Sequence, residues 1–202
     1  MIIYYKRILF LIIFLPYFTF ADLPPDKLIT QAVQQLILEL TDRKAELEGD
    51  RTQLYELVDR VIVEHIAVER VARLVLGKHW RDASMEQRSR FAYEFKNLLI
   101  RTYASALFDY TGSEKMTFRP LKIGGTERTI VVRTDIKLPG LSAIPVNYRF
   151  LRTNDAQWKI FDVTINGISL VTNYRSSYSQ LIEREGLDAL IRRLEQKTAM
   201  SR

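Results

Sequence analysis

The chain has 202 residues, of which 47% are hydrophobic, and a formal net charge of +6. It contains no cysteine, which excludes disulfides and thiolate metal sites, so an apolar core alone has to hold the fold. Without Lys6 and Arg7 the net charge falls to +4, and both signs are mixed along the chain. This mild excess favours approach to anionic lipid surfaces. No basic stripe with interleaved aromatic residues occurs, which argues against nucleic-acid binding.

The first 21 residues have the layout of a secretory signal peptide. A basic pair precedes an uncharged apolar run, Ile8–Phe18, which is about half of the ~20 residues that a bilayer-spanning helix needs. Small residues at Thr19 and Ala21 suit cleavage after Ala21. An uncleaved membrane anchor is the alternative, which Pro16 favours. We expect a signal peptide over residues 1–21, export to the periplasm and one domain over residues 22–202.

Helical periodicity dominates the first half of this domain, residues 22–112. Apolar residues recur at helical spacing in four segments, and Pro25, Asp50 or Thr52, and Ser84 provide the start signals. Gly49 and Gly77 provide stops. The expected helices are Pro25 to Glu48, Asp50 to a break near His65–Ala67, a shorter helix to Leu76, and a long helix from Ser84 to about Tyr110.

Strand alternation replaces the helical period from Lys115 onward. Short turns such as Gly124-Gly125 and Pro139-Gly140 separate the segments, as is typical of antiparallel neighbours. The expected strands are Met116–Ile123, Arg128–Leu138, Ile144–Thr153 and Gln157–Asn166, within a sheet region of residues 115–167. Two closing helices then follow over residues 169–198, with Gly186 between them. The sequence therefore predicts an α+β fold, in which N-terminal and C-terminal helices cover a curved antiparallel sheet of four or more strands.

Three stretches resemble the MlaC family of periplasmic phospholipid-binding proteins, also called the toluene-tolerance family. Their order and spacing make the match specific, and the resemblance spans nearly all of residues 22–202. The stretches are Val75–Arg81 with Gln87-Arg88, Phe91–Phe95, Leu98-Leu99 and Tyr103; Trp158–Val163 running into Gly167–Val171; and Asn173–Ser176 with Gly186 and Leu190.

The resemblance implies a carrier that shuttles phospholipids between the inner and outer membranes and maintains outer-membrane lipid asymmetry. It implies no catalysis and no cofactor, because the phospholipid is bound cargo. The implied partners are an inner-membrane MCE-type transporter ring and an outer-membrane lipoprotein with a porin. We expect a monomer that holds acyl tails in an apolar pocket.

The expected lipid-binding residues come from the long helix, the inner sheet face and the segment after Gly167. A one-residue error in strand register would exchange every strand member of this set. The set is Phe95, Leu99, Tyr103, Leu107, Val132, Thr134, Tyr148, Phe150, Leu170, Val171 and Tyr174. Arg175 and Lys78 are candidates for headgroup contact, because a fixed cation near a cavity mouth suits a phosphate.

Competing interpretations remain for several of these residues. An aromatic stripe on a helix builds a filled core as readily as a pocket wall. Arg175 could instead form a surface salt bridge, with Asp162 as a candidate partner. The alternative function is a small-molecule enzyme, an isomerase or hydrolase that uses a cavity carboxylate such as Asp162. His65 and His79 lack the spacing of a metal site, and Ser169 suits a helix N-cap better than a nucleophile.

Overall fold

The computed structural model describes residues 23–104, 115–121, 124, 126–140 and 142–199. Helices precede and follow one block of strands, in the order that the sequence predicts, with seven α-helices and five strands in the described ranges. The helices are α1 (Pro25–Asp42), α2 (Lys44–Gly49), α3 (Arg51–Val61), α4 (Val68–Leu76), α5 (Met85–Ala104), α6 (Leu170–Glu185) and α7 (Leu187–Ala199). The strands are β1 (Lys115–Phe118), β2 (Thr129–Lys137), β3 (Ile144–Arg152), β4 (Trp158–Ile165) and β5 (Ile168–Ser169).

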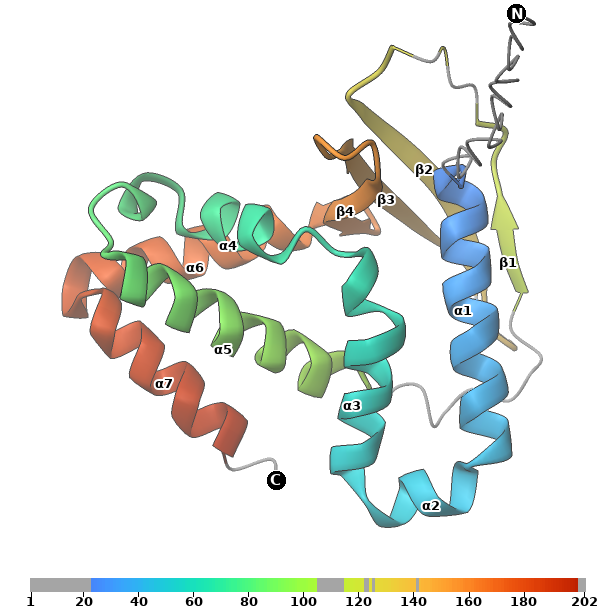
Figure 1. The fold of residues 1–202 in the computed structure, drawn as a ribbon, viewed down its shortest axis with the longest axis horizontal. Coiled ribbons are helices and arrows are strands. Elements are labelled where there is room, and N and C mark those ends of the chain that lie inside the picture. The colour runs from blue at the N-terminus through green and yellow to red at the C-terminus, as the bar shows by residue number, and fades with distance from the viewer. Residues whose placement is uncertain (1–22, 105–114, 122–123, 125, 141, 200–202) are drawn as a thin grey trace, which may run out of the picture.

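The first predicted helix is divided in two at Arg43. Arg43 leaves the helical region, and its guanidinium donates hydrogen bonds to Glu46 and Gln53, which hold the turn between α1 and α3. The Asp50 side chain accepts a hydrogen bond from Thr52 N at 2.9 Å and caps α3, as the sequence predicts. The chain therefore makes a sharp corner, and α1 and α3 run side by side (Figure 1).

The five strands form one antiparallel sheet in sequence order, β1-β2-β3-β4-β5. Ile130, Val132 and Thr134 are buried and alternate with more exposed neighbours, which confirms the predicted inner face of β2. The pairing of β3 with β4 shifts between Arg149 and Phe150, so one extra residue of β4 lies in the ladder. This bulge and the two-residue strand β5 do not follow from the alternation of the sequence.

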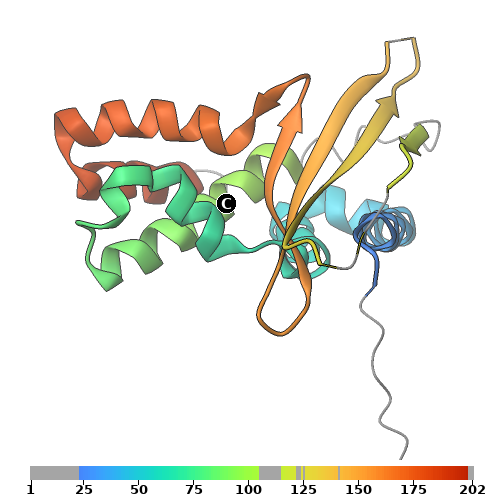
Figure 2. The same ribbon diagram turned by 90° about the horizontal axis from the view of Figure 1, so that it is seen from above.

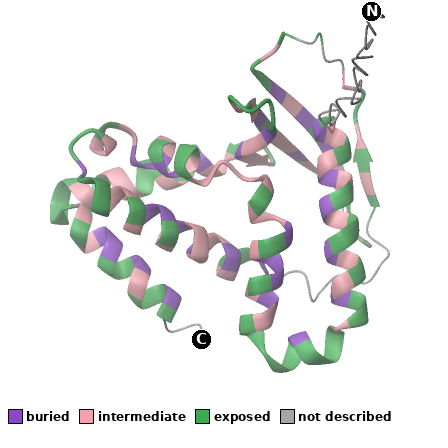
Figure 3. Cartoon of the chain, in the orientation of Figure 1, coloured by how far each residue is buried: buried purple, intermediate pink, exposed green. Residues whose placement is uncertain are grey.

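The helices divide between two regions. Helix α1 packs its buried face, with Ile29, against the inner sheet face (Figures 1 and 2). Helices α4, α5, α6 and α7 pack against one another beside the sheet and form what we call the helical lobe. Buried and exposed residues alternate around α1 and α7, as expected of amphipathic helices (Figure 3).

The C-terminal helices cover the sheet less than the sequence suggests. Helix α6 reaches the sheet at β4 and β5, but its main neighbours are α4 and α7. Helix α7 buries Leu190, Ile191 and Leu194 against Phe91 and its neighbours in the helical lobe. Helices α4 and α5 provide the apolar surface on which α6 and α7 pack.

Some predictions fall outside the described residues. The signal peptide over residues 1–21, the end of the long helix near Tyr110 and the pocket candidate Leu107 belong to this group. Of the helices in the described ranges, none combines the length and the hydropathy that a membrane span requires.

Candidate functional site

An apolar cavity lies between α1, the ends of α3 and α5, and the inner face of the sheet. Its volume is about 480 Å³, within the ~300–1,000 Å³ that is usual for ligand sites. Its wall consists of Leu28, Ile29, Ala32, Val33, Leu36, Val58, Ile62, Val63, His65, Leu99, Ile100, Tyr103, Ala104, Ile136, Val146, Tyr148, Phe150, Ile160, Val163, Ile165 and Leu170.

Two periodicities build this wall. The residues from α1 recur every three or four positions, so they share one helix face. Val146, Tyr148 and Phe150 recur every second position on β3, so they share one sheet face. Ala32, in the middle of the α1 contribution, has the shortest side chain of the helix face and leaves space opposite the strands. The cavity thus follows from two apolar faces that do not fill the gap between them.

The wall carries no group that is permanently charged. Burial lowers the pKa of His65 below its usual range, opposed by Glu64, whose Oε1 lies 3.1 Å from His65 Nε2. Burial raises the pKa of Tyr148, opposed by a hydrogen bond with Thr134. Both side chains are therefore neutral at pH 7. Such a surface suits a hydrocarbon ligand, because no ion loses its hydration when the ligand enters.

Five of the predicted lipid-binding residues lie in the cavity wall: Leu99, Tyr103, Tyr148, Phe150 and Leu170. Val132 and Thr134 belong to the same inner sheet face but lie beneath the wall, each with 1% of its surface exposed. The Thr134 hydroxyl donates to the Val146 carbonyl at 2.9 Å, which satisfies it within the sheet.

Three predicted residues, Phe95, Val171 and Tyr174, lie in the core of the helical lobe and not in the cavity wall. The ring of Phe95 stacks on Phe91 with centroids 5.5 Å apart and meets the edge of Tyr174 at 5.0 Å. The space on this side of α5 is therefore filled by rings. Tyr174 still borders the site indirectly, because it is hydrogen-bonded to Tyr103 of the wall. Burial and this neighbour raise the pKa of Tyr174 to about 12.

The contribution of α1 and α3 to the wall was missed in the sequence. Leu28, Val33 and Leu36 were recognised only as part of the helical apolar period, and Ala32 was not singled out. The small side chain of Ala32 is the signal that could have indicated a hollow. The positions of Ile136 and Val163 follow once the sheet face is known.

Neither candidate for headgroup contact belongs to the cavity wall. Lys78 Nζ lies 2.6 Å from Glu183 Oε1, in an exposed ion pair. Arg175 Nε donates to the Leu74 carbonyl at 2.7 Å. The alternative pairing of Arg175 with Asp162 is wrong, because the arginine near that carboxylate is Arg149, at 3.8 Å.

Asp162 joins the sheet to α6. Its carboxylate accepts hydrogen bonds from Ser169 Oγ at 2.8 Å and from Val171 N at 3.2 Å, and only 5% of the residue is exposed. Ser169 in turn accepts from Thr172 N at 3.1 Å and caps α6, which confirms its predicted role. Asp162 lies outside the cavity wall, so it does not face the ligand that the cavity could hold.

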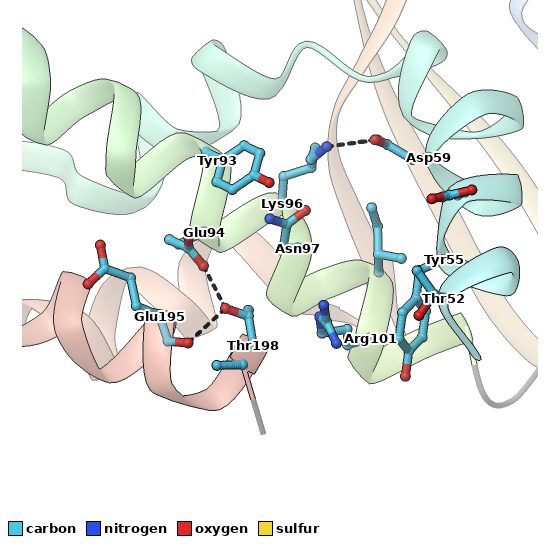
Figure 4. Close-up of a pocket in the computed structure, with 13 residues that line it drawn as sticks. Thr52, Tyr55, Asp59, Tyr93, Glu94, Lys96, Asn97, Arg101, Glu195 and Thr198 are labelled. Atoms are coloured by element: carbon cyan, nitrogen blue, oxygen red, sulfur yellow. Dashed lines mark hydrogen bonds and ion pairs between the residues drawn. The ribbon is translucent and has the colours of Figure 1, made fainter. Parts of the chain in front are cut away.

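A second hollow, between α3, α5 and α7, has the opposite character (Figure 4). Its volume is about 340 Å³, and charged side chains line it. Lys96 Nζ lies 2.7 Å from Asp59 Oδ2, and the Thr198 hydroxyl donates to Glu94 Oε2 at 2.6 Å. A hydrocarbon in this cleft would strip water from these charges, so the apolar cavity is the better candidate.

Comparison with known proteins agrees with the character of the cavity. The family model described as MlaC protein matches residues 30–196. The chain is 24% identical, over 89% of its length and 84% of the relative, to the intermembrane phospholipid transport system binding protein MlaC of Haemophilus influenzae. It is 25% identical to the toluene tolerance protein ttg2D of Pseudomonas putida, over 91% of this chain and 84% of that protein.

A solved structure shares the fold. The phospholipid-binding protein from Ralstonia solanacearum, in complex with a phospholipid, superposes with a TM-score of 0.77 at 26% identity. The match covers 87% of this chain and 97% of that one. The family model spans most of the chain, and the structural match covers a similar share of it. The chain belongs to the MlaC protein family.

Proposed function

We propose that this protein is a phospholipid carrier that holds the acyl tails of its cargo in the apolar cavity. The observation that carries the proposal is the wall itself, which surrounds about 480 Å³ without a permanent charge. Relatives named for phospholipid binding and transport, one of them solved with a phospholipid, support the choice of ligand.

The physical need for such a carrier is large. Each methylene group exposed to water costs about 0.8 kcal/mol, so a diacyl lipid with about 30 of them faces a barrier on the order of 20 kcal/mol. A cavity that replaces water with side chains removes most of this cost. It needs no polar recognition of the tails, which fits the apolar character of the wall.

The proposed setting is the periplasm, reached by means of the signal peptide over residues 1–21. A shuttle between membranes needs one partner at each of them. We propose an inner-membrane MCE-type ring and an outer-membrane lipoprotein with a porin, as the family resemblance implies. The name of the Haemophilus influenzae relative, which refers to an intermembrane transport system, supports this setting.

The proposal assigns no reaction and no cofactor to the protein. The carboxylate that an enzyme would use, Asp162, is engaged by Ser169 and Val171 and lies outside the cavity wall. It anchors α6, which is a structural role. Phospholipid is thus proposed as cargo that leaves the protein chemically unchanged.

The test is mass spectrometry of the purified mature chain, both intact under native conditions and as an organic extract. We expect a phospholipid in a fixed ratio to protein. Ile136→Asp places a carboxylate in the cavity wall and should reduce this ratio at least tenfold, on the scale of a buried unpaired charge. Thr129→Asp is the matched control, because Thr129 is exposed on the same strand and the variant adds the same single negative charge. Protein that carries no lipid, or equal loading of both variants, would overturn the proposal.

A further inference from the structure

A small groove on the helical lobe gathers arginine side chains. It lies between the end of α4, the 3₁₀ turn Gly77–Trp80 and α6, which run next to each other in Figure 1. Its volume is about 230 Å³. The residues that line it, which we call the arginine groove, are Arg73, Leu74, Gly77, Trp80, Arg81 and Arg175.

The three arginines of this groove lack acidic partners among the described residues. Elsewhere in the protein, guanidinium groups pair with carboxylates, as in Arg60–Glu39 at 2.6 Å and Arg90–Glu195 at 2.6 Å. Arg175 bonds only the neutral carbonyl of Leu74. The acids near these arginines do not compensate: Glu69 and Asp82 make no ion pair with a described residue, and Glu183 is engaged by Lys78. Like charges that converge without a counter-charge repel one another, so the groove is suited to an external anion.

One arginine of the groove, Arg175, is held in place by neutral contacts, and Arg88 outside the groove holds the backbone beside Arg81. A Cβ at Gly77 would lie 3.3 Å from Arg175 Cδ, so the Arg175 stem packs closely over the glycine backbone. Arg88 lies over the Trp80 ring at 5.2 Å and donates to the Trp80 carbonyl at 3.0 Å, which fixes the turn before Arg81. A guanidinium fork held in this way loses little freedom when it binds an oxyanion bidentately.

The dimensions of the groove select the kind of anion. A hollow of about 230 Å³ accommodates one phosphate and its immediate substituents. A stable protein–protein interface needs roughly 800 Å² from each partner, which the groove alone does not provide. Trp80 is half-buried beside the arginines, and indole groups are frequent where an apolar layer meets water.

We propose that the arginine groove binds the phosphate of a phospholipid headgroup presented by an anionic bilayer, and so docks the protein on a membrane surface. The inference rests on the proposed function in one respect, which is that a lipid carrier has to meet a bilayer. The arginine groove is separate from the cavity wall, so the docking proposal and the carrier proposal can fail independently.

The experiment is co-sedimentation of the mature chain with vesicles of phosphatidylglycerol or of phosphatidylcholine at low ionic strength. The wild type should bind phosphatidylglycerol vesicles more strongly. Arg73→Gln combined with Arg81→Gln should weaken this binding by about 30-fold, since each basic residue near an anionic surface contributes about fivefold. Both positions are exposed and lack ion pairs with described residues, so the variant should fold.

The matched control is Arg51→Gln combined with Arg192→Gln, which removes the same charge from exposed positions outside the groove. It should weaken binding by less than about threefold, because its charges do not converge on one phosphate. Equal loss in both variants would overturn the proposal, since net charge alone would then explain the binding.

Equal binding of the wild type to both kinds of vesicle would also overturn it and would direct attention to an acidic protein surface. Binding of inorganic phosphate without vesicle binding would reduce the groove to a site for a free anion. The extracted phospholipid keeps the two proposals apart. Wild-type protein without cargo would refute the carrier, whereas a variant with normal cargo and weak vesicle binding would support the docking site.

Discussion

The helical lobe and the region between α1 and the sheet both collect apolar residues, but they use them differently. In the helical lobe, the rings of Phe91, Phe95 and Tyr178 touch one another and fill the space. Between α1 and the sheet, the short side chain of Ala32 lines the cavity, and the space stays open. The comparison teaches that periodicity identifies an apolar face, whereas the summed volume of two facing layers decides whether the gap is filled.

Removal of a ring from the filled region should have the largest effect on stability. Phe91 is fully buried and contacts Phe95 and Tyr178. Phe91→Ala should lower the free energy of unfolding by about 3–5 kcal/mol, measured by urea denaturation. The lipid content of the folded fraction should remain normal, because Phe91 lies outside the cavity wall. A Phe91→Ala variant of normal stability that has lost its lipid would mean that the helical lobe holds the cargo.

Enlargement of a side chain should separate the two regions most clearly. Ala72 is fully buried in the helical lobe, and Ala72→Trp should cost about 1–3 kcal/mol or more by overpacking. Ala32→Trp enters the cavity and should change stability by less than about 1 kcal/mol, while it displaces the cargo. Urea denaturation and lipid extraction on both variants check this. Equal destabilisation would mean that the cavity is not hollow in solution.

Loss of the Asp162 charge, which joins the sheet to α6, should have an intermediate effect on stability. Asp162→Asn keeps the shape but removes the charge that accepts from Ser169 and Val171. Hydrogen bonds to charged groups contribute about 1.5–3 kcal/mol, so stability should fall by about 1–3 kcal/mol with normal lipid content. Thermal or urea unfolding with lipid extraction checks both. Wild-type stability would contradict the anchoring role of Asp162.

The smallest effect on stability should come from titration of Tyr174, which lies where the helical lobe borders the cavity wall. Burial raises the pKa of Tyr174 from 10 to about 12, so the fold favours the neutral phenol. This contribution to stability is complete below pH 10 and is lost as the pH rises toward 12. Urea denaturation between pH 8 and pH 11.5 should therefore show a decline that is shallower in Tyr174→Phe. Identical slopes would mean that Tyr174 ionises freely in the folded protein.

Much of the fold could be predicted because its signals are local. Asp50 and Ser84 mark helix starts by capping, and Pro25 marks one as a proline in the first turn. The alternation of Ile130, Val132 and Thr134 fixes one sheet face. The division at Arg43 and the bulge beside Phe150 depend on contacts between distant segments, which no local pattern contains.

The site could be predicted only in part for the same reason. Leu99 and Phe95 lie four residues apart on one face of α5 and looked equivalent, but Leu99 reaches the cavity wall as well as the helical lobe, whereas Phe95 is buried in the helical lobe alone. Which side of α5 is filled depends on α6 and α7, and α1 enters the wall only through its packing on the sheet. The family resemblance identified the kind of ligand, whereas the wall required the three-dimensional arrangement.

The central claim is that the acyl tails lie between α1 and the sheet. Photocrosslinking tests it directly, with a phospholipid that carries a diazirine near the end of one acyl chain and peptide mapping by mass spectrometry. We predict adducts on the α1 and β3 parts of the wall, such as Leu36 and Tyr148. Adducts concentrated on Phe95, Val171 and Tyr174 of the helical lobe would contradict the account.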